Sequence, residues 1–424
     1  MSENVDVLIV GGGASGLMAA IASAGVQGVS RVVLAEKMPR VGKKLLATGN
    51  GRCNFTNVNA DDMSFYKSGR PETVARVLAR FTRGDTERFF NSVGVSARTE
   101  DGRLYPYSLL AGAVVDALRF EAGRLGVKTV TDTPVTVVEY GGGRYRAAGF
   151  AAKSLVVATG GMASPSLGSD GSGYAILTGF GHAKTAVFPA LTQLVTEKAA
   201  IRGLSGIRVT AKAALYTGGV LAADGTDELL FTDYGLSGPL ALSLSREASA
   251  YLNALPEAEN CGVTLDLFPE MDKEELLAKL LDRRRNHAEW AAEELFLGLA
   301  HKRVGLAVMR AAGIAHTGLC GGFAQEDILS AAEFAKAYPI TVTGTRGFAD
   351  AQVTCGGIAL DDFAPDTLSS RLSPGLFACG EVLDADGQCG GFNLQWAWSS
   401  GYAAGRGAGL FAARADARID RQRL

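Results

Sequence analysis

The sequence is poor in the residues from which metal centres and disulfide frameworks are built. Among its 424 residues are only 4 histidines and 6 cysteines, and no two cysteines have CxxC spacing. Neither a zinc site nor a thioredoxin-type pair is therefore predicted, and the histidines show no ligand spacing. We expect no bound metal, and reduced thiols of the kind found in cytoplasmic proteins. His182, which follows a helix ending in Gly-Phe-Gly, is expected to be a cap or a surface residue.

An excess of charge of one sign is also missing. The 42 basic and 44 acidic side chains give a net charge of about −2, so no global field attracts nucleic acid. The run "RRRNH" at 283–287 fits a solvated helix face, and a phosphate-contacting patch is the alternative. An RNA substrate would require such a local basic patch.

Long hydrophobic runs are absent as well. The first apolar run follows two acids, carries no basic residue before it, and is broken by glycines from Gly11 onward, which excludes a signal peptide. No stretch of about 18 apolar residues occurs elsewhere, so no membrane span is expected. These absences favour a cytoplasmic protein.

Glycine, in contrast, is abundant, with 54 residues in short clusters beside apolar segments. The segment "VDVLIV" (5–10) is typical of a buried parallel strand, "GGGASG" (11–16) of a tight turn, and "LMAAIASAG" (17–25) of a helix. A second strand, "RVVLAE" (31–36), ends in an acid. This order predicts the opening of a nucleotide-binding βαβ unit.

Each glycine of the turn has a separate purpose in such a unit. Gly11 allows the turn, Gly13 lets a pyrophosphate approach the backbone, and Gly16 lets helix and strand pack closely. Glu36 would accept hydrogen bonds from a ribose diol, and its charge disfavours the 2′-phosphate of NADP.

Two further glycine segments favour FAD over NAD as the bound dinucleotide. "SLVVATGG" (154–161) and "GLFACGEVLDADG" (375–387) each end an apolar strand. Glu381 or Asp384 could bind the ribityl hydroxyls. A helix opening at 393–395 would point its N–H groups at the flavin ring, where they stabilise the charge of the reduced form.

The polar segment "GKKLLATGNGRCNFTN" (42–57) leaves the carboxyl edge of the predicted sheet, where ligands of such folds lie. Its lysines, Lys43 and Lys44, and Arg52 can offset phosphates and the anionic reduced flavin, or the lysines are solvated. Asn54 and Asn57 can bind flavin edges or brace the loop. Cys53 is open to three readings: a buried packing residue, a proton donor, or a thiolate that tunes the ring.

These segments, with "ATGGMASPSLGSDGSGY" (158–174), "FTDYGLSGP" (231–239) and "GGFNLQWAWSSG" (390–401), resemble those of the BaiN/RdsA-type flavoproteins. That family belongs to the glutathione-reductase-like superfamily with two dinucleotide-binding domains. The resemblance covers essentially the whole chain. It departs at Asp233, commonly histidine in the family, and at Cys355, so no one member's substrate is transferred.

The resemblance implies an α/β fold with a Rossmann-like FAD-binding domain built from both chain ends. We place that domain at 1–186 and 348–424, where the sequence texture is similar. An inserted β-barrel-like domain is expected at 187–268 and 336–347, and a small helical domain at 269–335. Asp272, with Glu275 three residues on, is expected to cap the first helix of that last part.

The expected function is a hydride transfer between reduced FAD, bound non-covalently, and an activated double bond. No second complete βαβ unit is visible, so NADH or NADPH would visit the flavin transiently. Members of the family are tied to reduction of unsaturated bile-acid intermediates, to oxidation of aminoacetone by oxygen and to dihydrouridine formation in ribosomal RNA. These substrates, and a non-catalytic flavin-binding module, stay open as alternatives. The oligomeric state is not predicted.

The expected catalytic residues are Cys53 and Arg52. The expected cofactor-binding residues are Gly11, Gly13, Ala14, Ser15, Gly16, Glu36, Lys37, Lys43, Gly49, Gly51, Arg52, Cys53, Asn54, Val135, Ala158, Thr159, Gly160, Gly161, Gly380, Glu381, Asp384, Gly391, Asn393, Leu394 and Gln395.

Overall fold

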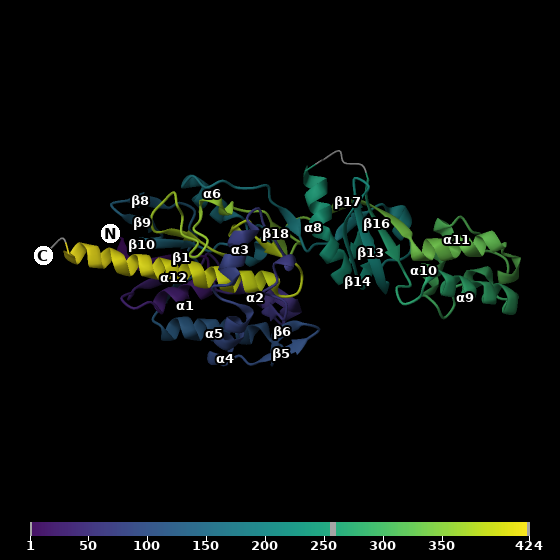
Figure 1. The fold of residues 1–424 in the computed structure, drawn as a ribbon, viewed down its shortest axis with the longest axis horizontal. Helices are drawn as coiled ribbons and strands as arrows, with labels where there is room; N and C mark the ends of the chain where they lie inside the picture. Colours follow the sequence, from purple (N-terminus) through teal and green to yellow (C-terminus); the bar gives the residue numbers. More distant parts are fainter. Residues whose placement is uncertain (1, 255–259, 422–424) are drawn as a thin grey trace. The chain divides into compact units, whose positions relative to one another are not determined.

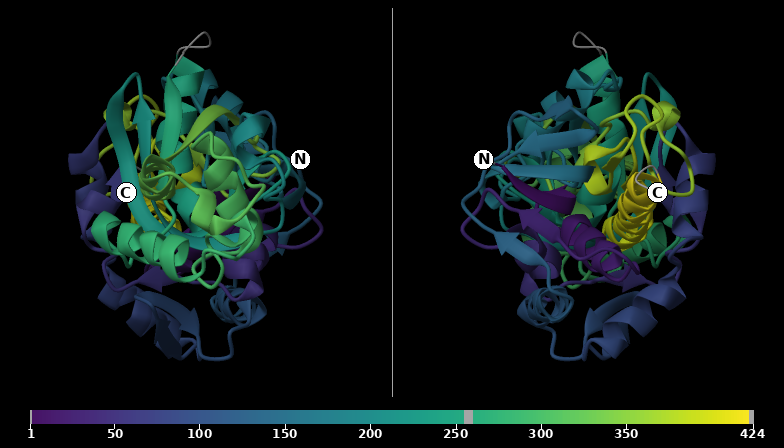
Figure 2. Two further views of the ribbon diagram at one scale, coloured as in Figure 1. Left: turned by 90° about the vertical axis from the view of Figure 1, so that its right-hand side faces the viewer. Right: turned by 90° about the vertical axis from the view of Figure 1, so that its left-hand side faces the viewer.

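The computed structural model describes residues 2–254 and 260–421, with side chains described up to residue 415. The chain divides into two compact units, one of residues 1–188 and 352–424 and the other of residues 189–351. Figures 1 and 2 show the elements of each unit. The first unit is therefore assembled from both ends of the chain.

A seven-stranded sheet forms the centre of the first unit, in the order β7-β2-β1-β10-β9-β8, with β19 also paired to β10. Its strands are β1 (Glu3–Val10), β2 (Val32–Ala35), β7 (Lys128–Val130), β8 (Glu139–Gly141), β9 (Arg144–Ala147), β10 (Phe150–Val157) and β19 (Leu376–Ala378). Strands β7, β2, β1, β10 and β19 run parallel, while β8 and β9 add an antiparallel hairpin. The predicted Rossmann-like sheet is confirmed.

Two helices pack together beside this sheet because small residues line their contact. Helix α1 (Ala14–Ala24) lies along α12 (Phe392–Arg421), as Figure 1 shows. A Cβ atom at Gly405 of α12 would lie 2.2 Å from the carbonyl oxygen of Ala19, and one at Gly401 would lie 2.5 Å from that of Ser15. Only glycine allows this approach, so the glycines of α12 let this C-terminal helix pack closely against α1 near the N-terminus.

The remaining elements of the first unit surround the sheet. They are α2 (Lys43–Ala47), η1 (Thr48–Gly51), β3 (Thr56–Asn57), η2 (Met63–Phe65), β4 (Tyr66–Lys67), α3 (Pro71–Leu78), α4 (Arg83–Ser92), β5 (Ala97–Glu100), β6 (Arg103–Pro106), α5 (Ala111–Arg124), η3 (Pro165–Leu167), α6 (Ser172–Gly179), β18 (Val353–Cys355), η6 (Leu360–Asp362), η7 (Gly380–Val382) and β20 (Asp386–Gly387). Strand β11 (Phe188–Ala190) begins at the boundary of the two units.

Two local expectations for this unit were wrong. The segment "RPETVARVLARFTRGDTERFFNSVG" (70–94), expected from its sequence to be one helical stretch, forms two helices, since Thr82 and Asp85 form a capping box that starts α4. His182 is neither a cap nor a surface residue, because it is 3% exposed. Its ring stacks on Phe363 at 4.3 Å, and its Nε2 atom lies 2.9 Å from the Ser370 hydroxyl.

The second unit contains a closed barrel in the order β12-β15-β14-β13-β16-β17. Its strands are β12 (Leu194–Thr196), β13 (Arg208–Thr217), β14 (Val220–Phe231), β15 (Gly235–Ser237), β16 (Cys261–Asp266) and β17 (Tyr338–Thr345). The helical elements are α7 (Lys198–Ile201), α8 (Gly238–Ala254), α9 (Lys273–Asn286), η4 (Ala292–Glu294), α10 (Lys302–Ala311), η5 (Cys320–Gly322) and α11 (Gln325–Lys336). The predicted barrel is confirmed.

One hydrophobic cluster runs through the barrel and the helices of this unit, from Leu215 and Val263 to Leu280, Val308 and Ile328. Asp272 caps α9 as expected, with its carboxylate accepting from the Glu275 N–H at 2.7 Å. The separation of a β domain from a helical domain stays a prediction.

Candidate functional site

Four parallel strands of the first unit end side by side. Val10 at the end of β1 is in register with Ala35 of β2 and with Val157 of β10, and Val157 is in register with Ala378 of β19. The loops that leave these strands therefore start along one edge of the sheet. Ligands of parallel α/β sheets bind outside this edge.

The loop after β1 forms the start of α1 and is open above. Gly11 adopts φ +106°, a conformation that favours glycine, and a Cβ there would lie 2.4 Å from the carbonyl oxygen of Ala158. Gly13 is the N-cap of α1 with no side-chain cap, and an added Cβ would find no atom within 4 Å. A Cβ at Gly16 would lie 1.8 Å from the carbonyl oxygen of Gly11. This leaves an uncapped helix N-terminus facing space, which fits a pyrophosphate.

Glu36 is held firmly at the end of β2. Its side chain is 8% exposed, and one carboxylate oxygen accepts from the Gly12 N–H at 2.6 Å while the other accepts from the Met38 N–H at 2.8 Å. Each oxygen keeps a lone pair for a ribose hydroxyl. Val135 lies on a neighbouring segment, two residues after Thr133, whose N–H donates to the Glu36 carbonyl at 2.9 Å.

The lysines of the second loop are paired with other loops of the site. Lys37 forms an ion pair with Asp170 at 2.6 Å, and Lys43 donates to the carbonyl oxygen of Ser166 at 3.1 Å. Although burial raises the pKa of Asp170, hydrogen bonds from Lys37 and Ser172 hold it below its ordinary value. The lysines are therefore not freely solvated charges, and they connect the loop after β2 with residues 166–170.

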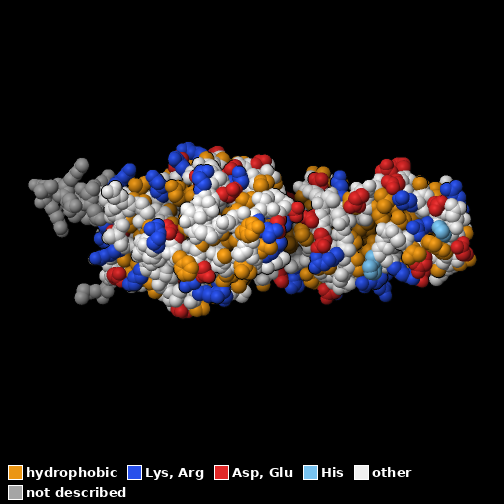
Figure 3. Space-filling model, turned by 90° about the horizontal axis from the view of Figure 1, so that it is seen from below, with side chains coloured by type: hydrophobic (Ala, Val, Ile, Leu, Met, Phe, Trp, Pro, Cys, Tyr) orange, Lys and Arg blue, Asp and Glu red, His pale blue; other side chains and the backbone are white. Residues whose placement is uncertain are grey.

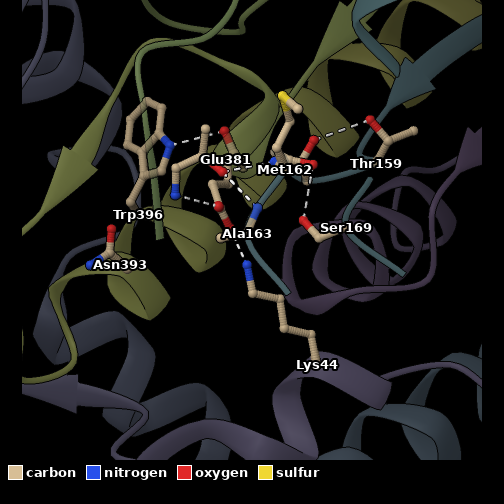
Figure 4. A network of polar contacts seen from close by, with 12 residues as sticks. Lys44, Thr159, Met162, Ala163, Ser169, Glu381, Asn393 and Trp396 are labelled. Carbon is tan, nitrogen blue, oxygen red and sulfur yellow. Dashed lines mark hydrogen bonds and ion pairs between the residues drawn. The ribbon is translucent and has the colours of Figure 1, made fainter. Parts of the chain in front are cut away.

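A polar network joins three of the loops, and Figure 4 shows its members. Lys44 forms an ion pair with one oxygen of Glu381 at 2.8 Å, and the other oxygen accepts from the Thr354 N–H at 2.8 Å. The Thr354 hydroxyl accepts from the N–H groups of Met162 and Ala163 at 2.7 and 2.9 Å. Because Thr354 is 1% exposed, these bonds fix the turn after β10.

The start of α12 contacts both the polar segment 42–57 and the turn at Gly380. Trp398 donates to the carbonyl oxygen of Phe55 at 2.8 Å, and Trp396 donates to that of Gly380 at 3.1 Å. Gly391, at φ +106°, lies so close to Thr56 that a Cβ would be 2.6 Å from the Thr56 carbonyl oxygen. The structure therefore brings residues 54–56 of the polar segment against Gly391 and Gln395.

The side chain of Gln395 is buried and forms all of its hydrogen bonds within the protein. Its side-chain oxygen accepts from the hydroxyls of Thr56 and Thr86 at 2.7 and 3.0 Å, and its amide donates to Phe81 and Ser399, each at 3.0 Å. These bonds satisfy both donors and both lone pairs. Its side chain is therefore unsuited to a flavin edge, and only backbone N–H groups at the start of α12 have free directions there.

The three asparagines expected near the flavin, Asn54, Asn57 and Asn393, have different contacts. Asn57 braces the loop, since it donates to the carbonyl oxygen of Gly390 at 2.9 Å and accepts from the Asn59 N–H at 3.0 Å. Asn393 holds the turn at Gly387, accepting from its N–H at 2.9 Å and donating to its carbonyl oxygen at 2.6 Å. Asn54 is only half-buried and lies beside Gly49.

Arg52 and Cys53 face different surroundings. Arg52 is paired with Glu100 at 3.1 Å and lies over the ring of Tyr105, with its guanidinium carbon 4.6 Å from the centroid. Cys53 has no exposed surface, and burial raises the pKa of its thiol to about 12. A thiolate at neutral pH is therefore disfavoured, and the packing role is the one that this geometry supports.

Sequence reasoning missed Thr354, Ser169 and Asp170 as parts of the site. Thr354 precedes Cys355, which was noted only as a departure from the family pattern. Ser169 donates to the carbonyl oxygen of Gly161 at 3.1 Å. The serine and aspartate stand in the quoted "GSDGSGY", so that motif was the available signal. Asp384 accepts from the Gly69 N–H at 3.2 Å.

The donor set at this edge fits an extended dinucleotide. It offers an uncapped helix N-terminus, a buried carboxylate, paired lysines, and open space at Gly13 and at Gly51, where an added Cβ would meet no atom within 4 Å. Within the described ranges, 2–254 and 260–421, no cluster of metal-binding side chains occurs. No helix in those ranges is long and apolar enough to cross a membrane.

Comparisons with known proteins agree with this description. The family model described as HI0933-like protein Rossmann domain matches residues 5–407. The chain is 39% identical over 408 residues to the 3-dehydro-bile acid delta(4,6)-reductase of Clostridium scindens, covering 94% of this chain and 98% of the relative. It is 30% identical over 411 residues to the ribosomal RNA dihydrouridine synthase of Escherichia coli, covering 95% and 97%. Among solved structures, the 3-ketosteroid delta1-dehydrogenase of Sterolibacterium denitrificans matches with a TM-score of 0.50 at 13% identity, over 97% of this chain and 100% of that one, which shows a shared fold alone.

Proposed function

The chain belongs to the HI0933-like Rossmann family, and from this premise we propose that it reduces an activated carbon–carbon double bond of a small molecule with electrons from bound FAD. It is an FAD-dependent oxidoreductase, so the alternative of a non-catalytic flavin module is set aside. When bound, FAD supplies a two-electron carrier that passes a hydride to the substrate.

The observation that carries the proposal is the meeting of four strand ends with the start of α12. The α1 N-terminus at Gly13 supports a pyrophosphate, and Glu36 supports a ribose. At the other end, Gly391, just before α12, lies against the backbone of Asn54 and Thr56. A dinucleotide with a second, ring-bearing half is the ligand that would use both ends.

The residues of this chain have separable tasks in the proposed reaction. Lys44, Glu381 and Thr354 hold the turns at 160–163 and 380–382 in fixed positions. The helix dipole of α12 favours negative charge at its N-terminus, which assists the reduced state of the ligand. Arg52, paired with Glu100, adds positive charge beside the 49–54 backbone.

The proposed substrate class derives from the relative in Clostridium scindens, a reductase of unsaturated 3-dehydro-bile acids. A carbonyl conjugated to the double bond makes the remote carbon electrophilic, which is what hydride transfer needs. Electrons would come from NADH or NADPH arriving from solution. A proton from solvent or a side chain would complete the saturated product.

The test is a set of anaerobic reduction experiments with the purified yellow protein. We expect NADH or NADPH to bleach the flavin absorbance, and a 3-dehydro-4,6-diene bile acid to restore it as one of its two carbon–carbon double bonds is reduced. Bleaching by neither nucleotide would contradict the donor part of the proposal. Bleaching of the flavin by aminoacetone, followed by reoxidation with oxygen and release of hydrogen peroxide formed from that oxygen, would instead identify an amine oxidase.

Ribosomal RNA is the second candidate substrate, because relatives at 29% and 30% identity over most of the chain are ribosomal RNA dihydrouridine synthases. The near-neutral net charge of −2 gives this candidate no general electrostatic support. A strain that lacks this protein would lose dihydrouridine from its ribosomal RNA if the second candidate is right, and would keep it if the first one is.

A further inference from the structure

An apolar groove with exposed aromatic edges lies beside helix α5. It has a volume of about 730 Å³, and Val93, Val95, Pro106, Ala113 and Ala117 contribute to its lining. At its edges Tyr107 and Phe120 are 70% and 71% exposed, and the neighbouring Leu110 is 62% exposed. We call these residues, with the charged residues of α5, the α5 patch. Figure 3 shows the face of the molecule that carries α5 and α4.

Single exposed apolar residues are ordinary, but a cluster beside a recess is not. Soluble proteins rarely expose contiguous apolar surface rimmed by polar side chains unless it binds a partner. Two large exposed aromatic side chains, Tyr107 and Phe120, line one groove, while Val137, as exposed as Phe120 at 71%, does not line it. The cluster therefore calls for an occupant.

The shape and charge of the patch indicate which occupant it takes. An isologous contact uses one patch on both molecules, so that patch must carry both a projection and a recess. Phe120 supplies the projection and the groove supplies the recess. The exposed charges of α5 form two balanced pairs, Asp116 with Arg119 at 2.9 Å and Glu121 with Arg124 at 2.7 Å.

A patch with balanced charge does not repel its own copy, whereas a nucleic acid would need an excess of positive charge. Asp116 and Arg124 stand four residues before and after Phe120, on the same face of the helix. Two antiparallel α5 helices that cross near Phe120 therefore set Asp116 opposite Arg124 of the partner subunit. The charges complement one another when the patch meets itself.

We propose that the protein forms a two-fold symmetric homodimer through the α5 patch. The α5 helices cross in antiparallel orientation, and each Phe120 side chain covers the groove of the other protomer. This contact lies within the first unit and does not depend on the reaction that the protein catalyses.

The test is sedimentation velocity on the FAD-loaded full-length protein between about 1 and about 100 µM, the range of typical reversible association. We expect wild type to have twice the chain mass of 44.1 kDa. Phe120→Glu and Tyr107→Glu should weaken the dimer at least about tenfold, since aromatic side chains dominate such contacts. Val137→Glu, equally exposed but outside the patch, is the matched control and should leave the dimer intact.

The flavin spectrum and melting temperature of each variant establish that it is folded. Two patch variants are used so that the test still stands if one of them does not fold. A wild-type protein that stays monomeric at the highest concentration overturns the proposal. So do patch variants that dimerise as wild type does. A monomer whose binding to a ribosomal RNA fragment is lost in the patch variants would assign the patch to RNA instead.

Discussion

Replacing Thr354 by valine tests whether the polar network positions the turn at 160–163. Valine keeps the branched shape but removes the hydroxyl that accepts from the Met162 and Ala163 N–H groups at 2.7 and 2.9 Å. Thr354 is 1% exposed, so water reaches the orphaned donors poorly. Each unsatisfied buried N–H costs about 1–3 kcal/mol, which predicts a loss of about 2–6 kcal/mol for the pair.

Two measurements on Thr354→Val should move together. Chemical denaturation of the FAD-free protein should show the lower unfolding free energy. Titration with FAD, followed by flavin fluorescence, should show a dissociation constant raised at least about tenfold, equivalent to about 1.4 kcal/mol. The second effect is expected because the turn that the threonine holds is one wall of the proposed cofactor site.

Thr354→Ser is the matched control. It keeps the hydroxyl and deletes one methyl group, which costs roughly 1 kcal/mol. We expect its FAD affinity to stay within about threefold of wild type, a difference below about 0.7 kcal/mol. The reasoning would be refuted if valine and serine had equal effects, or if the valine variant bound FAD as tightly as wild type.

Four further predictions concern Gly13, Gly16, Asp6 and the cysteines. Gly13→Ala should leave the stability of the FAD-free protein unchanged but weaken FAD binding at least about tenfold, because the added Cβ meets no protein atom and enters the proposed pyrophosphate space. Gly16→Ala should instead lower the melting temperature, since its Cβ would lie 1.8 Å from the Gly11 carbonyl oxygen; equal thermal stability of the two variants would contradict this. For Asp6, burial raises the pKa, but Lys153 and the N–H groups of Ser30 and Arg31 together hold it below its ordinary value of 3.8. Its stabilisation is therefore complete above that value and lost as pH falls through the lower folded pKa, so the unfolding free energies of wild type and Asp6→Asn should differ most at neutral pH and converge in strong acid. In a titration with a thiol reagent, Cys389 should react first, because it is half-buried and the other cysteines are buried. Cys53 should react slowly, because the pKa of its thiol is raised to about 12. Fast labelling that persists in the Cys389→Ser variant would refute this order.

Local sequence patterns predicted those helices and strands in which neighbouring residues all favour the same secondary structure. The run 338–345 alternates between buried and exposed along its length and forms β17 over just those residues. The first strand, glycine turn and helix appear where the apolar run and the small residues placed them. In both cases the signal lies within about ten residues, so no distant partner is needed to decide the structure.

A side-chain hydrogen bond can divide a segment whose residues favour helix throughout. The residues of 70–94 indicated one helical stretch, but Thr82 and Asp85 bond to each other's backbone N–H groups and begin a new helix. Within 42–57, the residues "KKLLA" form the short helix α2, because straight-chain and alanine residues favour helix even beside glycines. Periodicity alone does not record such caps.

The candidate site shows the deeper limit, because its contacts join residues far apart in sequence. Lys44 and Glu381 are separated by 337 positions, and Thr56 and Gln395 by 339. The motif around Gln395 correctly brought α12 to the polar segment, yet the side chain that seemed suited to a flavin edge is spent on Thr56, Thr86, Phe81 and Ser399. A pattern of residues thus located the site, while the division of each side chain between binding and bracing depended on packing. The network around Thr354 brings in a residue that the sequence did not assign to the site, and its hydroxyl is therefore the most direct place to separate the two roles.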